Sequence, residues 1–343
     1  MRRARIHISA LAAVLLVGCA TAPDLSKLPP LRLKPPGSLL RQVRAGGTLS
    51  GNLATACAPT EGRLVGVVID NDPHARPQSG LAAACVIYEV PTEAQIPRFL
   101  AVFNGGGPEE VGPIRSVRPA FLEIAEELGA VVVHAGQSVP AFLWIQSHRY
   151  PVVNQFWVPQ PFWRVRTRRM PHNLYGSVPR VRAVMAQRGY DRPPPSPHPA
   201  ALPYVDPEGP GAHRITIGFL RGFEAEFVYE NGRYVRFTAG RPHLDARTGS
   251  PVAVHAVIVQ FVPWRGWRSG RVDVSEVGVV GEGKALVFAF GRVVEARWAK
   301  PREASSTAFV DRQGRGLRLP PGPLWVCLVP IGTRVGFRPT PTP

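Results

Sequence analysis

Side chains capable of acid–base and anion-binding chemistry gather in one stretch of the sequence, from Val67 to Gly136. Short apolar runs in this stretch repeatedly end in acids, amides, arginines or histidine, which would cost free energy if they were buried without partners. Ligands of open α/β sheets bind beyond the strand ends, so this pattern predicts a site there. The polar residues concerned are Asp70, Asn71, Arg76, Gln78, Glu89, Glu93, Arg98, Arg115, Arg118 and His134.

Acid–base catalysis is one chemistry that these residues could perform. Glu89 with Glu93 or Asp70 could form a carboxylate pair of the kind that hydrolyses glycosidic bonds, and His134 could transfer a proton. The many nearby arginines would lower the pKa values of these acids, which suits ion pairing or ligand positioning better than proton donation. The catalytic candidates are therefore Glu89, Asp70 and His134.

Arg115 and Arg118 are the second notable pair. Two guanidinium groups three residues apart, just before a predicted helix N-terminus, could grip a phosphate or a carboxylate. Alternatively, they pair internally with Glu89, Glu93 or Asp70 and hold the strand ends together. The sequence favours neither alternative over the other.

Nucleophilic, metal and phosphate-loop chemistry have weaker support. Ser79 and Ser116 could act as nucleophiles, but the chain has no Gly-x-Ser-x-Gly motif. The acidic run 70–72 could bind Mg²⁺ or Ca²⁺, although such a triplet is more typical of a turn at a strand end. The glycines at 105–107 lack the Lys-Ser or Lys-Thr of a phosphate loop, and 281–284 is expected to be a hairpin turn. We therefore expect no metal and no cofactor.

The pattern of apolar residues predicts an α+β protein. In the first part, strands around 64–69, 86–88, 99–103 and 131–133 alternate with helices that begin near Pro119, Val139 and Val178. In the second part, short strands and glycine turns follow one another, and Asn231-Gly232 is a typical type I′ hairpin turn. A mixed α/β N-terminal domain and a mostly antiparallel β C-terminal domain are expected. The predicted segments are a tether at 19–60, the N-terminal domain at 61–190, a Pro-rich linker at 191–211 and the C-terminal domain at 212–338.

The N-terminus has the form of a lipoprotein signal. Three arginines precede a short apolar run that ends in Leu16-Val17-Gly18-Cys19, so residues 1–18 are expected to be removed and Cys19 lipidated. The alternatives are an ordinary secretory signal or an uncleaved anchor. Lipidation would anchor the protein on the extracytoplasmic face of the cell membrane. Cys57, Cys85 and Cys327 then remain, and three cysteines allow at most one internal disulfide.

The chain of 343 residues carries a formal net charge of +17, and removal of residues 1–18, with three arginines and no acid, leaves +14. Outside the cytoplasm, such a protein meets anionic lipids and acidic wall polymers rather than nucleic acid, and its arginines are scattered. The charge also fits a genome rich in Arg, Ala and Pro codons. Nucleic acid is therefore not an expected partner.

Several long strings, in order, resemble the YerB-like bacterial lipoproteins: IDNDPHARPQSG, VIYE, RFLAVF, VGPIRSVRP, VHAG and PHNLY. The second half resembles the C-terminal domain of that family, as at Leu244-Asp245 and at Arg297 to Lys300. Cys85 stands where relatives usually have Asp, so a mechanism that needs an acid there is in doubt. The positions that match the family's characteristic polar residues are Asp70, Asn71, Arg76, Gln78, Ser79, Glu89, Glu93, Arg98, Arg115, Ser116, Arg118, His134, His172 and Asn173.

The resemblance implies a two-domain envelope lipoprotein with no established enzymatic activity and an association, in some bacteria, with class A penicillin-binding proteins. We therefore expect a non-enzymatic, peptidoglycan-associated binding or regulatory protein, with a penicillin-binding protein or an anionic wall polymer as its partner. The alternative is an envelope hydrolase that acts on glycan or phosphodiester bonds through Glu89, Asp70 or His134. Carboxylates that face each other across an open cleft would favour the enzyme, whereas carboxylates each bound by an arginine would favour structure or binding.

Overall fold

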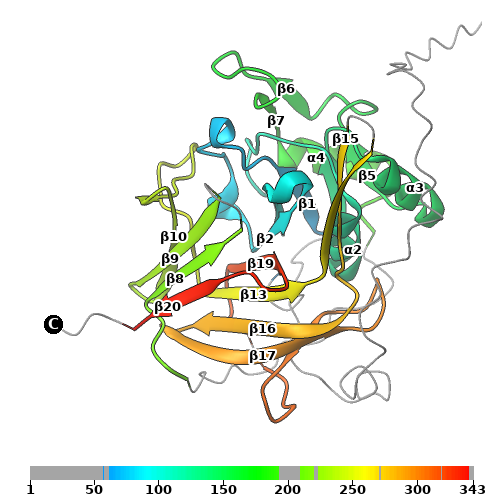
Figure 1. Cartoon of the computed structure of the whole chain (residues 1–343). Helices are drawn as coiled ribbons and strands as arrows, with labels where there is room; N and C mark the ends of the chain where they lie inside the picture. Colours follow the sequence, from blue (N-terminus) through cyan, green and yellow to red (C-terminus); the bar gives the residue numbers. More distant parts are fainter. Residues whose placement is uncertain are drawn as a thin grey trace, which may run out of the picture.

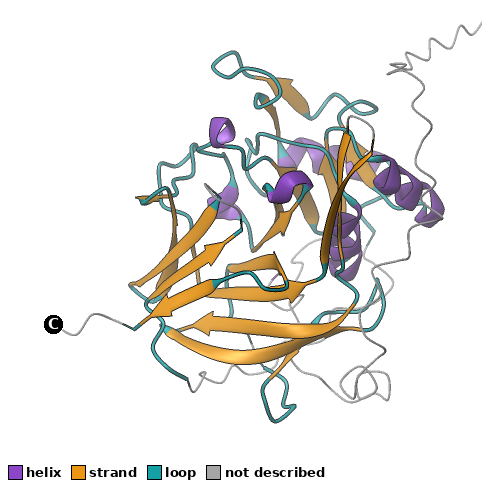
Figure 2. Cartoon of the chain, viewed as in Figure 1, coloured by secondary structure: helices purple, strands orange, loops and turns teal. Residues whose placement is uncertain are grey.

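The computed structural model describes residue 57 and residues 62–192, 209–219, 223–269, 272–317 and 319–339. The predicted signal peptide, the lipidation site Cys19, most of the tether and most of the Pro-rich linker lie outside these residues. The α+β class is confirmed: strands dominate, and the longer helices all belong to the first part of the chain (Figure 2). Among the described residues, no helix combines the length and apolar character needed to cross a membrane.

The N-terminal segment contains the three α-helices that the sequence predicts. A proline lies in the first turn of each, the Ser138 and Ser177 side chains accept hydrogen bonds from the backbone amides of Ala141 and Arg180, and Gly129 ends the first helix in the left-handed conformation. The elements are β1 (Val65–Ile69), β2 (Val86–Pro91), β3 (Pro97–Phe103), α2 (Pro119–Leu128), β4 (Val131–His134), α3 (Val139–His148), β5 (Val152–Asn154), β6 (Phe162–Arg164), β7 (Leu174–Gly176), α4 (Val178–Gln187) and the one-turn 3-10 helices η3 (Pro73–Ala75), η4 (Leu81–Ala83) and η5 (Glu93–Gln95).

The described C-terminal residues form strands and turns. Asn231 and Gly232 have φ angles of 50° and 79°, as the predicted type I′ turn requires. The strands are β8 (Arg214–Gly218), β9 (Glu224–Glu230), β10 (Arg233–Thr238), β11 (Arg241–Pro242), β12 (Ala253–Val254), β13 (Ala256–Val262), β14 (Trp264–Ser269), β15 (Val272–Val277), β16 (Gly281–Ala289), β17 (Arg292–Lys300), β18 (Ala308–Val310), β19 (Leu324–Pro330) and β20 (Val335–Arg338).

The expectation of a hairpin turn at 281–284 is wrong, because these residues form the start of β16. Gly283 lies opposite Trp298 of β17, and a Cβ atom at Gly283 would come within 2.6 Å of the Trp298 indole nitrogen. Glycine is therefore needed here for close packing within a strand, not for a turn.

One ten-stranded sheet runs through both halves of the sequence, in the order β18-β17-β16-β13-β19-β2-β3-β1-β4-β5 (Figure 1). The halves join at its centre, where β19 pairs in parallel with β13 on one side and with β2 on the other. The predicted parallel pairing also occurs between β1 and β4 and between β4 and β5. The C-terminal segment thus completes the sheet that the N-terminal segment begins.

Each face of this sheet is covered by other elements, which gives two cores. Side chains alternate along the strands, so that Val68 and Val326 face the core that includes α2 and α3, whereas Val67 and Trp325 face the opposite core. That second core also contains α4 and the inner faces of a smaller sheet, ordered β11-β10-β9-β8-β20 with β12 paired to β10. The C-terminal end of β1 and the loop of the β6–β7 hairpin lie close together, because Asp70 contacts His172 there. Figure 1 shows the hairpin above the large sheet.

A disulfide links Cys57 to Cys85, with the two Cα atoms 5.4 Å apart, and Cys327 is a free, buried thiol. This pairing settles which of the three remaining cysteines form the single disulfide that the count allows. It also gives a structural role to Cys85, the residue that replaces the usual Asp. The disulfide thus fastens Cys57, which lies before β1 in the sequence, to Cys85, which directly precedes β2.

A second link between the halves is a buried ion pair on the α2 side of the sheet. Lys300 of β17 lies 3.1 Å from the Glu127 carboxylate of α2 and donates a hydrogen bond to the Glu123 carbonyl. The same carboxylate accepts hydrogen bonds from the backbone amide and the hydroxyl of Thr307. Because Lys300 and Thr307 both come from the other half, this acid fastens α2 to the C-terminal segment.

We predict that Lys300→Met lowers the free energy of unfolding by about 3–5 kcal/mol, because it leaves the buried Glu127 carboxylate without its cation. Chemical denaturation of the purified chain measures this. Arg297→Met is the matched control: Arg297 lies on the same strand in a half-exposed pair with Glu282, and its loss should cost no more than about 1 kcal/mol. Equal losses in the two variants would contradict the assignment of Lys300.

Candidate functional site

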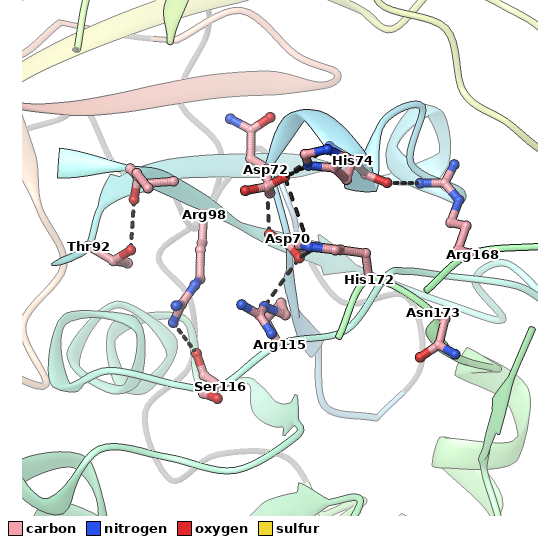
Figure 3. Close-up of polar contacts among 12 residues, drawn as sticks. Asp70, Asp72, His74, Thr92, Arg98, Arg115, Ser116, Arg168, His172 and Asn173 are labelled. Carbon is pink, nitrogen blue, oxygen red and sulfur yellow. Dashed lines mark hydrogen bonds and ion pairs between the residues drawn. The ribbon is translucent and has the colours of Figure 1, made fainter. Parts of the chain in front are cut away.

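The outer part of the predicted site is a cluster around Asp70, at the end of β1 (Figure 3). The Asp70 carboxylate lies 3.2 Å from the Arg115 guanidinium and 2.7 Å from Nδ1 of His172, which comes from the loop between β6 and β7. Its other oxygen accepts a hydrogen bond from the backbone amide of Asp72. Asp72 in turn contacts His74, with 2.8 Å between the carboxylate and Nδ1 of the imidazole. Three segments that are distant in the sequence therefore converge on one carboxylate.

A second group surrounds Glu93, between β2 and β3. Arg118, at the start of α2, and Arg98, on β3, both form ion pairs with the Glu93 carboxylate. Burial alone would raise the pKa of Glu93, but the hydrogen bond from Arg118 and the two positive charges outweigh it, so that this pKa is lowered. Burial, with the neighbouring charge of Arg118, lowers the pKa of Arg98 to about 10. Arg98 also donates to the backbone carbonyl of Ser116 (Figure 3).

Glu89 is fully buried, between the large and the small sheet. Its carboxylate pairs with Arg236 of β10, at 2.9 and 3.0 Å, and accepts a hydrogen bond from the Trp325 indole. The Arg236 guanidinium lies over the rings of Trp325, Phe227 and Phe99, at 4.5–5.6 Å from their centroids. A charge so deeply enclosed by protein positions its neighbours but cannot reach a ligand in solvent.

The amides of the predicted site connect Glu89 to the Asp70 cluster. Asn71 donates to Glu89 and accepts from Arg76, and Gln78 donates to the Asp70 backbone carbonyl. The Gln78 side-chain oxygen lies 2.7 Å from Nε2 of His243. Since burial and the charges of Arg236 and Arg76 hold the pKa of His243 well below its ordinary value, this imidazole is neutral and Nε2 donates the hydrogen bond.

Three predicted site residues are engaged elsewhere. Ser79 donates to Glu110, and Asn173 accepts a hydrogen bond from Arg164 within the β6–β7 hairpin. His134, at the end of β4, donates through Nδ1 to the carbonyl of Gly136, and burial lowers its pKa to about 4. These residues stabilise local structure around the cluster rather than extend it.

The arrangement of the acids fits internal pairing. Glu89, Glu93 and Asp70 are each bound by at least one arginine, as in the second alternative for Arg115 and Arg118. Asp70 and Glu93 pair with those two arginines, whereas Glu89 pairs with Arg236. Carboxylates held by cations position side chains and bind ligands, but they are poor proton donors near neutral pH.

Sequence reasoning missed four residues of the C-terminal segment that complete this network. They are Arg236, His243, Trp325 and Asp245, whose carboxylate accepts from the backbone amide of Ala82. Asp245 lies in a string noted for its resemblance to the family, yet nothing in its spacing connects it with Glu89. One signal in the sequence could have revealed the need for such a partner. Glu89 is the single charged residue in the apolar run VIYEV, so its charge has to be balanced by a residue from elsewhere.

Both halves of the chain contribute to this fold and to the polar network between Glu89 and the Asp70 cluster. The chain therefore has the character of a two-part family, and the function of that family is unknown. The chain belongs to it: residues 49–191 match the N-terminal domain and residues 215–326 the C-terminal domain of the family described as "protein of unknown function (DUF3048)".

Two comparisons agree with this assignment. The chain is 32% identical over 292 residues to "Putative lipoprotein YerB" of Bacillus subtilis (strain 168), which covers 81% of this chain and 84% of that protein. The crystal structure of the YerB protein from Bacillus subtilis superposes with a TM-score of 0.69 at 28% identity, and it covers 81% of this chain and 94% of the other. The expected YerB-like family is thus confirmed, and the relative's name includes the expected lipoprotein character.

The buried pair between Glu89 and Arg236 yields a stability prediction. Arg236→Met should lower the free energy of unfolding by about 3–5 kcal/mol, because it removes the cation that pairs with the buried Glu89 carboxyl group between the sheets. The double variant Glu89→Gln/Arg236→Met should recover much of that loss, since it removes both charges. Denaturant titration measures both, with Arg214→Met, which breaks a solvent-exposed pair with Glu226, as the near-neutral control. A double variant as unstable as the single one would contradict the argument.

His134 yields a pH prediction. Its folded pKa of about 4 lies below the ordinary 6.5, so the unfolded chain binds the proton more tightly, and stability falls as pH drops from about 6.5 to 4. The shift corresponds to about 3 kcal/mol at most. In His134→Gln, which keeps a donor for Gly136, the stability lost between pH 7 and 4.5 should be smaller by about 2 kcal/mol. Parallel pH profiles of the two proteins would refute the assignment.

Proposed function

We propose that this chain is a membrane-anchored lipoprotein of the cell envelope that acts as a non-enzymatic binding or regulatory protein. The lipobox ending at Cys19 and the lipoprotein name of the Bacillus relative support the anchor. The anchor would hold the folded part on the extracytoplasmic face of the cell membrane. Its partner would be a cell-wall synthesis enzyme, such as a penicillin-binding protein, or an anionic wall polymer.

The observation that carries the binding function is the pairing of every predicted catalytic acid. Asp70 is held by Arg115 and His172, and Glu89 by Arg236 and Trp325. An acid–base enzyme needs one carboxyl group that gives up a proton and another that accepts it near the scissile bond. Neither acid is in a position to do so, whereas fixed charges at a strand edge can orient a bound partner.

A set of exposed apolar side chains next to this edge supports contact with a protein. Val139, Phe142 and Leu143 share one face of α3, and Phe156 and Trp157 follow β5. The Asn154 side chain ties the loop that leads into α3 to the segment after β5, because it contacts both Gly136–Gln137 and the amide of Phe156. We call these five residues the apolar rim. Exposed apolar groups gathered in this way are typical of interaction surfaces.

The location of the rim connects it to the predicted site. A Cβ atom at Gly136 would lie 3.3 Å from the Phe156 ring and 3.5 Å from the Ser116 hydroxyl. A partner on the rim would therefore also meet the loop that carries Arg115, Ser116 and Arg118. Aromatic anchors with arginine beside them are the residues that most often dominate the free energy of protein association.

The alternative function, an envelope hydrolase acting on glycan or phosphodiester bonds, is favoured by one observation. Nε2 of His134 is buried and has no hydrogen-bond partner among the described residues. Its lowered pKa leaves it unprotonated at neutral pH, as a general base must be. The assignment would require a substrate to reach a fully buried ring.

The test compares partner recovery by three forms of the lipidated chain in cross-linked membranes. Wild type should recover a wall-synthesis enzyme, and Phe156→Ser/Trp157→Ser should recover at least tenfold less, because the aromatic anchors are lost. Ile331→Ser is the matched control: Ile331 and Phe156 are both 67% exposed, but Ile331 lies between β19 and β20 in the C-terminal half. It should recover as much partner as wild type does.

Other outcomes separate the remaining hypotheses. Recovery of a wall polymer instead of a protein would keep the binding function but change the ligand. If the rim substitutions leave the recovery of the partner unchanged, the apolar rim is not part of the binding site. Turnover of a wall substrate that is lost in His134→Gln while the fold survives would establish the hydrolase instead.

A further inference from the structure

Three side chains at the outer end of the Asp70 cluster present metal-binding atoms to one point. They are Asp72, His74 and His172, each offering a carboxylate oxygen or an imidazole nitrogen, and the three atoms lie within 4.8 Å of one another. Asp72 and His74 lie at η3, after β1, whereas His172 comes from the β6–β7 loop. The imidazole rings of His74 and His172 stack with centroids 5.8 Å apart. The sequence had suggested only the run 70–72 as an oxygen site, and neither histidine belonged to that idea.

His172 is held in the form that a metal ligand needs. Its Nδ1 lies 2.7 Å from the Asp70 carboxylate, so this nitrogen carries the hydrogen and Nε2 presents its lone pair. Nε2 lies on the side of Asp72, at 4.0 Å from the carboxylate. A carboxylate behind a histidine is the usual second shell of zinc sites, where it fixes the ring and strengthens the ligand. Asp70 is itself fixed by Arg115, at 3.2 Å.

The spacing of the three atoms suits a small transition-metal ion. The Asp72 oxygen is 2.8 Å from Nδ1 of His74 and 4.0 Å from Nε2 of His172. An ion equidistant from the three would lie about 2.4 Å or less from each, compared with roughly 2.0–2.2 Å in established zinc sites. The exposed side chain of His74 can supply the small remaining adjustment, because few contacts restrain it. Two imidazoles and one carboxylate favour zinc or cobalt over Mg²⁺ or Ca²⁺, which prefer oxygen ligands.

The two loops that carry these ligands are tied together independently of any metal. Arg168, from the same loop as His172, donates to the backbone carbonyls of His74 and Pro77 at 3.2 and 2.6 Å (Figure 3). The ligands are thus brought together before an ion arrives, which lowers the entropy cost of binding.

We propose that Asp72, His74 and His172 bind one Zn²⁺-class ion, with Asp70 as the positioning residue behind His172. Three protein ligands leave at least one coordination position for water or for an anionic group of a ligand. On binding, the ion takes the place of the hydrogen bond between Nδ1 of His74 and the Asp72 carboxylate, and the ring hydrogen of His74 is then carried by Nε2. The proposal does not depend on the apolar rim or on any partner.

The test is calorimetric titration of ZnCl₂ into the full chain, purified in detergent without a polyhistidine tag and stripped with a chelator. Wild type should bind one equivalent with a Kd in the micromolar range or tighter. His74→Ala should weaken binding at least tenfold, and His74→Ala/His172→Ala should abolish it. Asp70→Asn should weaken it by about 10–100-fold, since the second shell is lost. The matched control is His148→Ala, a surface histidine that pairs with Glu303.

Co²⁺ provides a second readout, because an ion held by two imidazoles and a carboxylate in a low-coordinate site gives visible absorption bands that are more intense than those of the aqueous ion and shifted in wavelength. These bands should be present in wild type and His148→Ala and absent in the double variant. His74 is exposed, so His74→Ala keeps the fold and remains informative even if His172→Ala does not. Failure of wild type to bind either ion, or equal binding by the double variant, overturns the proposal and leaves the binding function of the rim untouched.

Discussion

The buried pair between Glu89 and Arg236 is the interaction on which the rest of the structure depends. It lies between the two sheets, and its partners come from β2, β10 and β19. Neither charge could remain in that position alone, since an isolated ion in a protein interior is far less stable than in water. The pair therefore makes the two halves of the sequence mutually dependent: the acid comes from one half, and the cation and indole that stabilise it come from the other.

This dependence also explains why a cluster that looks catalytic in the sequence is largely structural. Every strand-end acid is bound by a cation or an amide, and the network extends from Glu89 through Asn71 and Gln78 to Asp70. Such a network is most stable when all its members are satisfied, and it then fixes the positions of the loops at its outer end. Those loops carry the histidines near Asp72, whereas the apolar rim lies on α3 and directly after β5.

The sequence predicted the local structure well. The prolines and serines near Pro119, Ser138 and Ser177 specify helix starts through interactions within a few residues, so the helices were predicted correctly. It could not predict the partner of Glu89, because Arg236 lies 147 residues away and its charge looks the same as that of any other arginine. The error at Gly283 has the same origin: a glycine required by a tryptophan on the neighbouring strand is indistinguishable in sequence from a glycine in a turn. Ion pairs at Asp70 and Glu93 were predicted as one of two alternatives because these acids and their arginines lie in the same polar stretch, 67–136.

The place of β19 in the large sheet has a consequence for how the protein is made. A chain synthesised from its N-terminus onward presents β1 to β5 long before residues 324–330 are available. Until then the edge of β2 that will pair with β19 is open, and its backbone groups there are unpaired. Glu89, which is buried in the finished fold, is exposed to water at this stage. Completion of the fold must wait for one of the last segments to be inserted between strands that are already made, so the large sheet closes only at the end of synthesis.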